Sequence, residues 1–342
     1  MRNRLSLAAL LIVSLSPLIV RAETPEGVQF TDYKGWPDSV VLGGGTTSKA
    51  KVVIVPAVGG RILHYGINED NIIYEVPGSD GKVLVNGKIK SWIGGYNCDI
   101  GPEIRTPPAH EILWVGPHKA TVTKPYSVST VSEPDAVTGI QMFKEITLDP
   151  KTGAVTIVQK MKNISDKETT FCLWDRTLCK GGGFVLMPIN PKSKHAKGWA
   201  LRLKQFGEDA FDTKTPESPN VKVMDGVLVA QATGKDVKNG KLGLDSDAGW
   251  MAFTVGKNLY IKSFPYYADG VYTDAGNSEE FYWSPEVGEI EPLSPEKKLK
   301  PGEDYTFTET WQLLTLDEEV TTFDQARKLV DKAAALVKEL KK

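Results

Sequence analysis

The sequence predicts an all-β protein, a large antiparallel β-sandwich with one amphipathic helix at its C-terminal end. Short alternating or β-branched runs follow one another from residue 28 to about residue 314, separated by Gly, Pro, Asn and Asp. No helical period interrupts them, and the turn DPKTG at 149–153 joins two runs as a hairpin. Many short strands without intervening helices indicate an antiparallel sandwich.

The predicted strands combine alternation or β-branched residues with turn residues at their ends. The turn KPGE at 300–303 starts the last strand, in which aromatic and acidic side chains alternate with threonines. In chain order the predicted strands are 51–55, 61–65, 71–75, 112–115, 120–123, 140–148, 155–161, 170–173, 184–187, 226–230, 250–255, 259–264, 281–283, 289–293 and 304–314.

The last 22 residues, 321–342, change to a helical period. Thr321 or Thr322 can cap the start, and Asp324 suits the positive end of the helix dipole. Such a helix either packs on the sandwich or binds a partner, and we favour packing. The apolar residues at helical spacing, with Lys and Arg opposite, are Phe323, Ala326, Leu329, Val330, Ala333, Val337 and Leu340.

The first 22 residues have the pattern of a secretory signal peptide. Arg2 and Arg4 precede an apolar run, and a small residue, Ala22, stands at the expected cleavage point. We therefore expect a signal peptide at 1–22, a sandwich domain at 23–320, and a periplasmic or secreted protein. No later run reaches the ~18 apolar residues of a membrane-spanning helix, so we expect no membrane insertion.

Composition excludes some partners. After cleavage at this site, 38 basic residues would face 43 acidic ones. This balance gives no reason to expect nucleic acid as a partner, and nothing in it indicates an oligomeric state. The sequence also lacks His-Glu-x-x-His, Cys pairs at metal spacing, and a Gly-x-Ser-x-Gly elbow.

No cofactor is expected, with one alternative left open. Asp269, Asp274 and Glu279 could place oxygen ligands around a Ca²⁺ ion in one loop, although acidic loops are usually only solvated. Three cysteines, at 98, 172 and 179, allow at most one disulfide, and we favour buried thiols over a bridge.

Candidate binding residues cluster in a proline-rich stretch. The segment CDIGPEIRTPPAH (98–110) holds Asp99, Glu103, Arg105 and His110, and its prolines exclude both a helix and a central strand. Polar loops fixed by proline often carry binding residues. We therefore interpret this stretch as a binding segment rather than a simple surface crossover.

A second candidate segment is WDR at 174–176. Adjacent residues of a strand point to opposite faces, so only one of Asp175 and Arg176 can line a given site. An ion pair with a neighbouring strand fits the pattern equally well.

The third candidate segment is GEIEPL (288–293). Glu289 and Glu291 share one face of a strand, which either is a solvated edge or lines a polar site. Tyr267, Tyr282 and Trp283 place aromatic rings near this pair in the sequence, and we expect Tyr267 or Trp283 to stack on a ligand. Aromatic faces beside carboxylates and arginines are a usual way to hold a sugar ring, although most aromatic residues of a large sandwich are core.

Five stretches, in this order and spacing, carry a resemblance to a known superfamily. They are VVIVPAVGGRILHYGINEDNIIYE (52–75), GGYNCDIGPEIRTPPAH (94–110), LWDRTLCKGGGFVLMP (173–188), GWMAFTVGKNLYIKSF (249–264) and GEIEPLSPEKKLKPGEDYTFTETW (288–311). Together they resemble the galactose mutarotase-like (aldose 1-epimerase-like) β-supersandwiches. More narrowly, they are similar to an uncharacterised bacterial family of secreted domains within that superfamily.

The resemblance implies a saccharide site with acid–base chemistry at the anomeric centre. Glu291, in Ile-Glu-Pro, falls on the general-base position, and Glu289 on the same face would raise the pKa of Glu291. His110 falls on a catalytic or binding position. The remaining residues implied to contact a mono- or oligosaccharide are Arg105, Arg176, Asp175, Glu289, Glu103, Tyr267 and Trp283.

The chain departs from the superfamily pattern at the acid. Where catalytic members carry a mid-chain His that protonates the ring oxygen, this sequence has Trp174-Asp175-Arg176. An arginine stays protonated at neutral pH and cannot act as that acid. Three hypotheses therefore stand: an epimerase-like enzyme, a non-catalytic sugar-binding protein, and a structural envelope protein whose C-terminal helix docks a partner.

Overall fold

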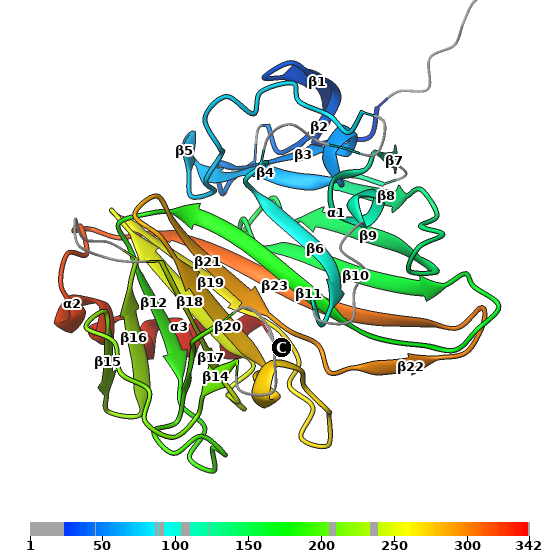
Figure 1. Ribbon diagram of the computed structural model, residues 1–342. Coiled ribbons are helices and arrows are strands. Elements are labelled where there is room, and N and C mark those ends of the chain that lie inside the picture. Colours follow the sequence, from blue (N-terminus) through cyan, green and yellow to red (C-terminus); the bar gives the residue numbers. More distant parts are fainter. Residues whose placement is uncertain are drawn as a thin grey trace, which may run out of the picture.

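The computed structural model describes residues 24–44, 46–85, 88, 92–103, 110–122, 124–204, 210–232 and 239–340. The predicted signal peptide and Arg105 lie outside these residues. Within them, two large sheets pack face to face, and every pairing between neighbouring strands is antiparallel (Figure 1). The predicted large antiparallel sandwich is confirmed.

The first sheet has 13 strands among the described residues, and its order brings segments far apart in sequence side by side. The short strands β5 (Asp70–Asn71) and β22 (Lys297–Leu299) pair with β4 and β11. The main path runs β1 (Val28–Tyr33), β2 (Trp36–Leu42), β3 (Ala50–Val55), β4 (Arg61–Ile67), β6 (Tyr96–Gly101), β11 (Thr169–Lys180), β21 (Val287–Pro292), β20 (Glu279–Trp283), β17 (Gly240–Leu244), β13 (Ala200–Arg202) and β14 (Phe211–Asp212).

The second sheet has ten strands among the described residues. The long β23 lies at its centre, and the hairpin of β9 and β10 beside it. Its order is β15 (Val221–Met224), β16 (Val227–Gln231), β12 (Phe184–Pro188), β18 (Trp250–Val255), β19 (Asn258–Ser263), β23 (Asp304–Thr315), β10 (Val155–Asn163), β9 (Ile140–Leu148), β8 (Ser127–Ser132) and β7 (His118–Thr121).

Alternation explains why these residues form half-buried strands. Along β9 and β10 every second side chain is buried and those between are half-buried. The buried face of each strand joins the apolar core between the two sheets. The predicted turn closes the hairpin, where a carboxylate oxygen of Asp149 accepts hydrogen bonds from the amides of Lys151 and Thr152.

The C-terminal residues form α2 (Phe323–Lys328) and α3 (Val330–Leu340). Thr322 caps α2 in a reciprocal capping box with Gln325. Ala326, Val330, Ala333 and Val337 are buried against the outer face of the second sheet. Figure 1 shows both helices in red beside strands of that sheet. The predicted amphipathic helix is confirmed, and its apolar stripe belongs to the fold.

Some sequence predictions were wrong in detail. The apolar run at 112–115 is not a strand but part of the short helix α1 (Glu111–Val115), since periodicity cannot separate the two for so short a run. Of the strand predicted at 71–75, only Asn71 belongs to a strand, as the last residue of β5 (Asp70–Asn71). The other short helices are η1 (Pro56–Val58) and η2 (Asp274–Gly276).

The three cysteines are buried and free, as the favoured interpretation predicts. Among the described residues, no helix has the length and apolar character needed to cross a membrane.

Candidate functional site

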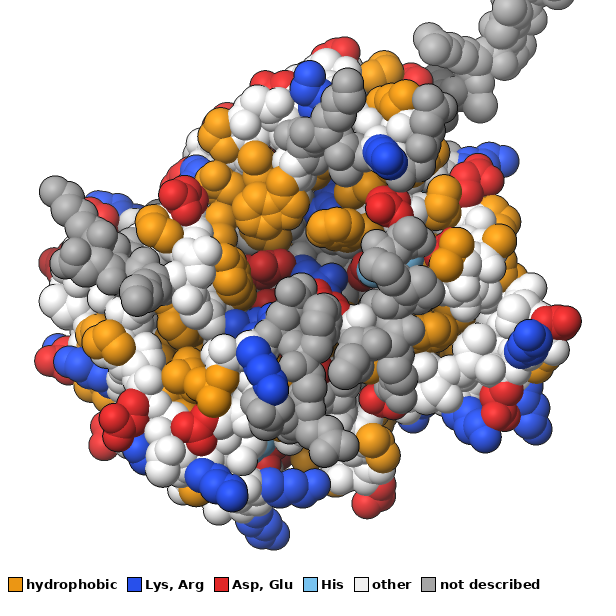
Figure 2. Space-filling model, in the orientation of Figure 1, with side chains coloured by type: hydrophobic (Ala, Val, Ile, Leu, Met, Phe, Trp, Pro, Cys, Tyr) orange, Lys and Arg blue, Asp and Glu red, His pale blue; other side chains and the backbone are white. Residues whose placement is uncertain are grey.

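The candidate site lies on the face of the first sheet that points away from the second. Asp175 of β11 points into the space between the sheets, where it contacts Lys262 of β19. Its neighbours Trp174 and Arg176 therefore point to the opposite face. Figure 2 shows a hollow on this face in which acidic and basic side chains gather.

Strand register extends this polar face across the sheet. Cross-strand partners share a face, so Asp99 of β6 lies opposite Trp174. On the other side of β11, Glu291 of β21 lies opposite Glu280 of β20. One strand further, Lys241 of β17 lies opposite Tyr282. Side chains from five strands thus line one polar surface.

Glu291 faces this surface but lies at its floor beneath other side chains. Its exposed fraction is only 1%. The carboxylate oxygen Oε2 accepts hydrogen bonds from Trp174 Nε1 at 2.8 Å and from Lys241 Nζ at 2.6 Å, and Arg176 Nε lies 4.0 Å away. The Arg176 guanidinium and the Lys241 ammonium lie 4.5 and 4.7 Å from the Trp174 ring centroid. Three groups therefore hold Glu291 in place.

Lys241 bridges two carboxylates. Its Nζ also lies 2.9 Å from Oε2 of Glu280, a fully buried side chain. Burial acts to lower the pKa of Lys241, but Glu280 and Glu291 outweigh it and raise that pKa above its ordinary value. Burial raises the pKa of Glu280 to about 8, although Lys241 opposes the shift. Lys241 is thus a fixed cation under the hollow.

Glu289 lies two residues before Glu291 on the same face, opposite Tyr282. It is half-buried, and burial raises its pKa to about 7, with the charge of Glu291 adding to the shift. The like-charge effect was expected to raise the pKa of Glu291, whereas here the charge of Glu291 raises the pKa of Glu289. An acid with a pKa near 7 can exchange protons at neutral pH.

Arg176 contacts two acidic residues of the proline-rich segment 98–110. Its Nη2 lies 2.9 Å from Oε1 of Glu103, and its Nη1 lies 3.9 Å from Oδ2 of Asp99. The same oxygen of Asp99 lies 2.8 Å from Nε2 of His110. The predicted residues Glu103, His110, Arg176 and Glu291 thus belong to one connected cluster.

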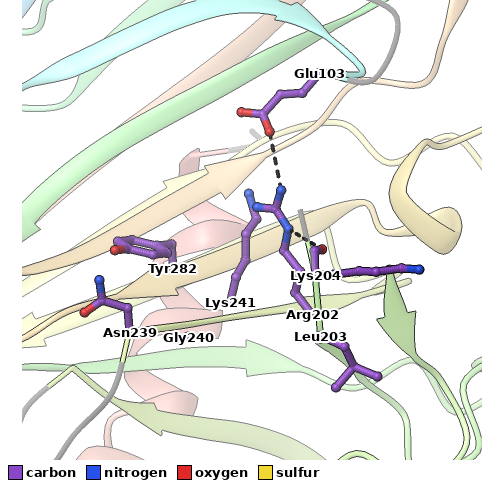
Figure 3. A pocket seen from close by; sticks show the side chains of 8 residues that line it. All are labelled: Glu103, Arg202, Leu203, Lys204, Asn239, Gly240, Lys241 and Tyr282. Atoms are coloured by element: carbon purple, nitrogen blue, oxygen red, sulfur yellow. Dashed lines mark hydrogen bonds and ion pairs between the residues drawn. The ribbon is translucent and has the colours of Figure 1, made fainter. Parts of the chain in front are cut away.

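A hollow of about 360 Å³ opens beside this cluster. Figure 3 shows Arg202 of β13 and Lys241 side by side beneath Glu103, with Tyr282 and Asn239 at the other end. The Arg202 Nη2 lies 3.5 Å from Oε2 of Glu103. The residues lining the hollow are Glu103, Arg202, Leu203, Lys204, Asn239, Gly240, Lys241 and Tyr282.

Arg202 and Lys241 were not predicted, and Tyr282 was named only as an aromatic residue near the acidic pair, with the stacking contact placed on Tyr267 or Trp283. Arg202 and Lys241 come from two short strands that were not predicted. Tyr282 lies in a predicted strand, but only the register shows that it, and not Trp283, shares a face with Glu289. Correct strand pairing is the signal that would have found it.

Three predicted contact residues lie elsewhere. Asp175 is fully buried between the sheets and contacts Lys262, so it cannot reach the hollow. Trp283 is 2% exposed and stacks on Phe281 in the core. Tyr267 is exposed in the loop after β19, with the Lys297 ammonium 5.6 Å from its ring centroid, and does not line the hollow.

The acidic residues considered for Ca²⁺ do not gather either. Glu279 is fully buried, and burial raises its pKa well above the ordinary value, whereas Asp274 lies in η2. In the part of the chain that the structure describes, no three His, Cys, Asp or Glu side chains are arranged to hold a metal ion.

The fold defines the class of protein. The chain has the galactose mutarotase-like fold. A structure of a galactose mutarotase-like protein from Lactobacillus casei aligns with a TM-score of 0.53 at 12% identity, covering 81% of this chain and 100% of that one. A galactose mutarotase related enzyme from Lactobacillus acidophilus aligns with a TM-score of 0.52 at 12% identity, covering 82% and 99%. Slr1438 from Synechocystis sp. PCC 6803 aligns with a TM-score of 0.55 at 12% identity, covering 87% and 100%.

Sequence comparison places the chain within a family. The chain belongs to the family described as domain of unknown function DUF4380, which matches residues 106–314. A search of curated proteins found no match. At 12% identity the structural likeness establishes the fold alone, so the activity must be argued from the site.

Proposed function

We propose that this protein recognises a mono- or oligosaccharide in the hollow beside Arg176, Arg202 and Lys241. The observation that carries the proposal is the polar hollow itself, which combines fixed cations and the carboxylate of Glu103 with the ring of Tyr282. Sugar rings stack on aromatic faces while their hydroxyls bind charged groups. A volume of about 360 Å³ lies within the usual range for small-molecule sites.

The geometry supports binding better than epimerase chemistry at Glu291. A general base must come within hydrogen-bond reach of the proton that it abstracts. Glu291 is 1% exposed and already accepts hydrogen bonds from Trp174 and Lys241. Arg176, which stands in the segment where the resemblance would place the acid, cannot release its proton at neutral pH. Glu291 is therefore assigned a structural role.

Calorimetric titration with a panel of reducing sugars tests this proposal. We expect at least one sugar to bind, and Tyr282→Ala to weaken that binding at least tenfold because the stacking surface is lost. The matched control is Tyr33→Ala, a half-buried tyrosine of β1 that bonds Glu75 away from the hollow. Absence of binding across the panel, or binding that Tyr282→Ala leaves unchanged, would overturn the proposal.

Glu289 favours a second candidate, an acid–base enzyme of the epimerase type. It is the half-buried carboxylate beside Tyr282, and its pKa of about 7 suits a base at neutral pH. It would accept the proton of the anomeric hydroxyl while the ring oxygen takes up a proton. In this candidate the donor would be His110, which was predicted only as a catalytic or binding residue. Positioned acid–base groups contribute roughly 10²- to 10⁴-fold.

Exchange spectroscopy between the two anomers of the bound sugar separates the candidates. An enzyme should speed anomer exchange, with a rate that rises with pH and levels off above about pH 7. Glu289→Gln should then lower the rate at least ~100-fold. If Glu291→Gln, checked for folding, abolished exchange while Glu289→Gln did not, the base would be Glu291. If a sugar binds but the protein does not change its rate of anomer exchange, the protein is a binding protein and the enzyme candidate is wrong.

We also propose that the protein is exported. The support is the pattern of residues 1–22, with its basic start, apolar run and Ala22. N-terminal sequencing of the mature protein from its native host should begin at Glu23. Recovery of the protein from the cytoplasm with its N-terminus intact would contradict export.

A further inference from the structure

One carboxylate of the protein lies between two arginines at the mouth of the hollow. Glu103 Oε1 lies 2.9 Å from Nη2 of Arg176, and its Oε2 lies 3.5 Å from Nη2 of Arg202. The arginines belong to β11 and β13, which are separated by β21, β20 and β17 in the sheet. Glu103 therefore joins two distant strands across the polar surface, and Figure 3 shows its contact with Arg202.

The position that Glu103 occupies has the features of an anion site. Its two oxygens each meet a different guanidinium, and guanidinium groups are well suited to carboxylates. Burial alone would raise the pKa of Glu103, yet Arg176, Lys241 and Arg202 together lower it. The cations therefore stabilise negative charge at this point.

The two arginines are better anchored than the carboxylate between them. Arg176 has 14% and Arg202 19% of its side chain exposed, whereas Glu103 has 37%. Arg176 is also held by Asp99 and Glu291. The carboxylate of a bound ligand could therefore replace that of Glu103 while the two arginines stay in place.

We propose that the hollow binds saccharides of the uronic-acid class, whose carboxylate takes the position of Glu103 between Arg176 and Arg202. The inference rests on the proposed saccharide-binding function and narrows its ligand. In this arrangement Glu103 competes with the ligand for the two guanidinium groups. Its removal should therefore strengthen binding of acidic sugars, the opposite of the usual effect of deleting a polar site residue.

Titration calorimetry with galacturonate, glucuronate, galactose, glucose and glucose 6-phosphate tests the inference. We expect a uronate to bind at least tenfold more tightly than its neutral counterpart, and more tightly than the phosphate ester. Glu103→Gln should strengthen uronate binding about fivefold and should not strengthen the binding of neutral sugars. Arg202→Gln, checked for folding, should weaken uronate binding at least tenfold. Added salt should weaken uronate binding because the contact is ionic.

The control is Glu217→Gln, which removes an exposed carboxylate paired with Lys197 away from this hollow. It should leave uronate affinity unchanged, so that a gain at Glu103 cannot come from net charge alone. Neutral sugars that bind as tightly as uronates, or Glu103→Gln that weakens uronate binding, would overturn the inference and leave saccharide binding standing. Preference for the phosphate ester would also overturn the uronate assignment. No binding of any sugar would overturn both proposals.

Discussion

Asp175 and Arg176 are consecutive residues of β11 whose side chains point to opposite faces of the first sheet. Arg176 lies on the polar face of the first sheet, where it contacts Glu103, Asp99 and Glu291. Asp175 lies between the sheets, where it contacts Lys262 of the second sheet. One strand therefore supports the candidate site on one face and ties the two sheets together on the other.

The ion cluster between the sheets should be a strong determinant of stability. Lys262 is fully buried, and its Nζ contacts Asp175 and lies 3.1 Å from Oε2 of Glu309. Lys262→Met would leave two buried carboxylates without their cation. Removing one partner of a buried ion pair typically costs about 3–5 kcal/mol. Urea unfolding should show a loss of this size.

A second substitution and a surface control make this prediction specific. Adding Asp175→Asn to Lys262→Met should recover part of the loss, because it removes one of the unpaired charges. Lys298→Met breaks an exposed pair with Glu168 and should cost less than about 1 kcal/mol. Equal losses from the buried and the exposed lysine would contradict the role assigned to Lys262.

Glu289 should contribute a loss of stability as the pH rises from about 4.5 to about 7, opposed over this range by His64 and His118, whose pKa values burial lowers. Burial raises the pKa of Glu289 in the folded protein from 4.5 to about 7. Between these values the folded state binds more protons at this group than the unfolded state, so raising the pH favours unfolding. Glu280, whose pKa is raised to about 8, extends the trend to higher pH.

Urea unfolding at a series of pH values checks this prediction. Glu289→Gln should remove the Glu289 contribution and make stability fall less, or rise more, between pH 4.5 and 7, since a glutamine has no proton to lose. Glu318→Gln makes the same change of charge at an exposed position before α2 and should keep the wild-type slope. A Glu289→Gln slope equal to that of the wild type would show that Glu289 makes no such contribution.

Strand periodicity was sufficient to predict the fold class, because half-buried antiparallel strands such as β9 and β10 alternate residue by residue. The same rule showed that only one of Asp175 and Arg176 could line a site. It could not show which one, because a face is assigned only once the sheet pairing is known. For the same reason the aromatic contact was placed on Tyr267 or Trp283, and Trp283 is one residue from Tyr282.

The exposure of Glu291 could not be predicted from its own segment. Its carboxylate is covered by Lys241, which lies 50 positions earlier in the chain. Lys241 belongs to β17, where glycines interrupt the strand pattern. Long-range pairing of β17 with β20, and of β20 with β21, brings the two charges together. The residue pattern within a single strand therefore cannot predict such a contact.

Adjacent aromatic residues in β20 should have separable roles. Trp283 is buried and stacks on Phe281, whereas Tyr282 is half-buried at the hollow. Trp283→Ala should cost about 3–5 kcal/mol of unfolding free energy, as large-to-small core substitutions do. Tyr282→Ala should cost less than about 1.5 kcal/mol, because little of its burial is in the core. Urea denaturation of both variants measures the difference, and similar losses would contradict the assignment of faces.

The C-terminal helix should stabilise the sandwich and not act as a free docking element. Ala333 is fully buried where α3 packs on the outer face of the second sheet. Ala333→Glu would bury a charge without a partner and should cost more than about 3 kcal/mol. Lys332→Glu, one residue away on the exposed face, should change stability by less than about 0.5 kcal/mol. If Ala333→Glu unfolded at the wild-type urea concentration, α3 would not be part of the core, and the hypothesis of a partner-binding helix would regain its basis.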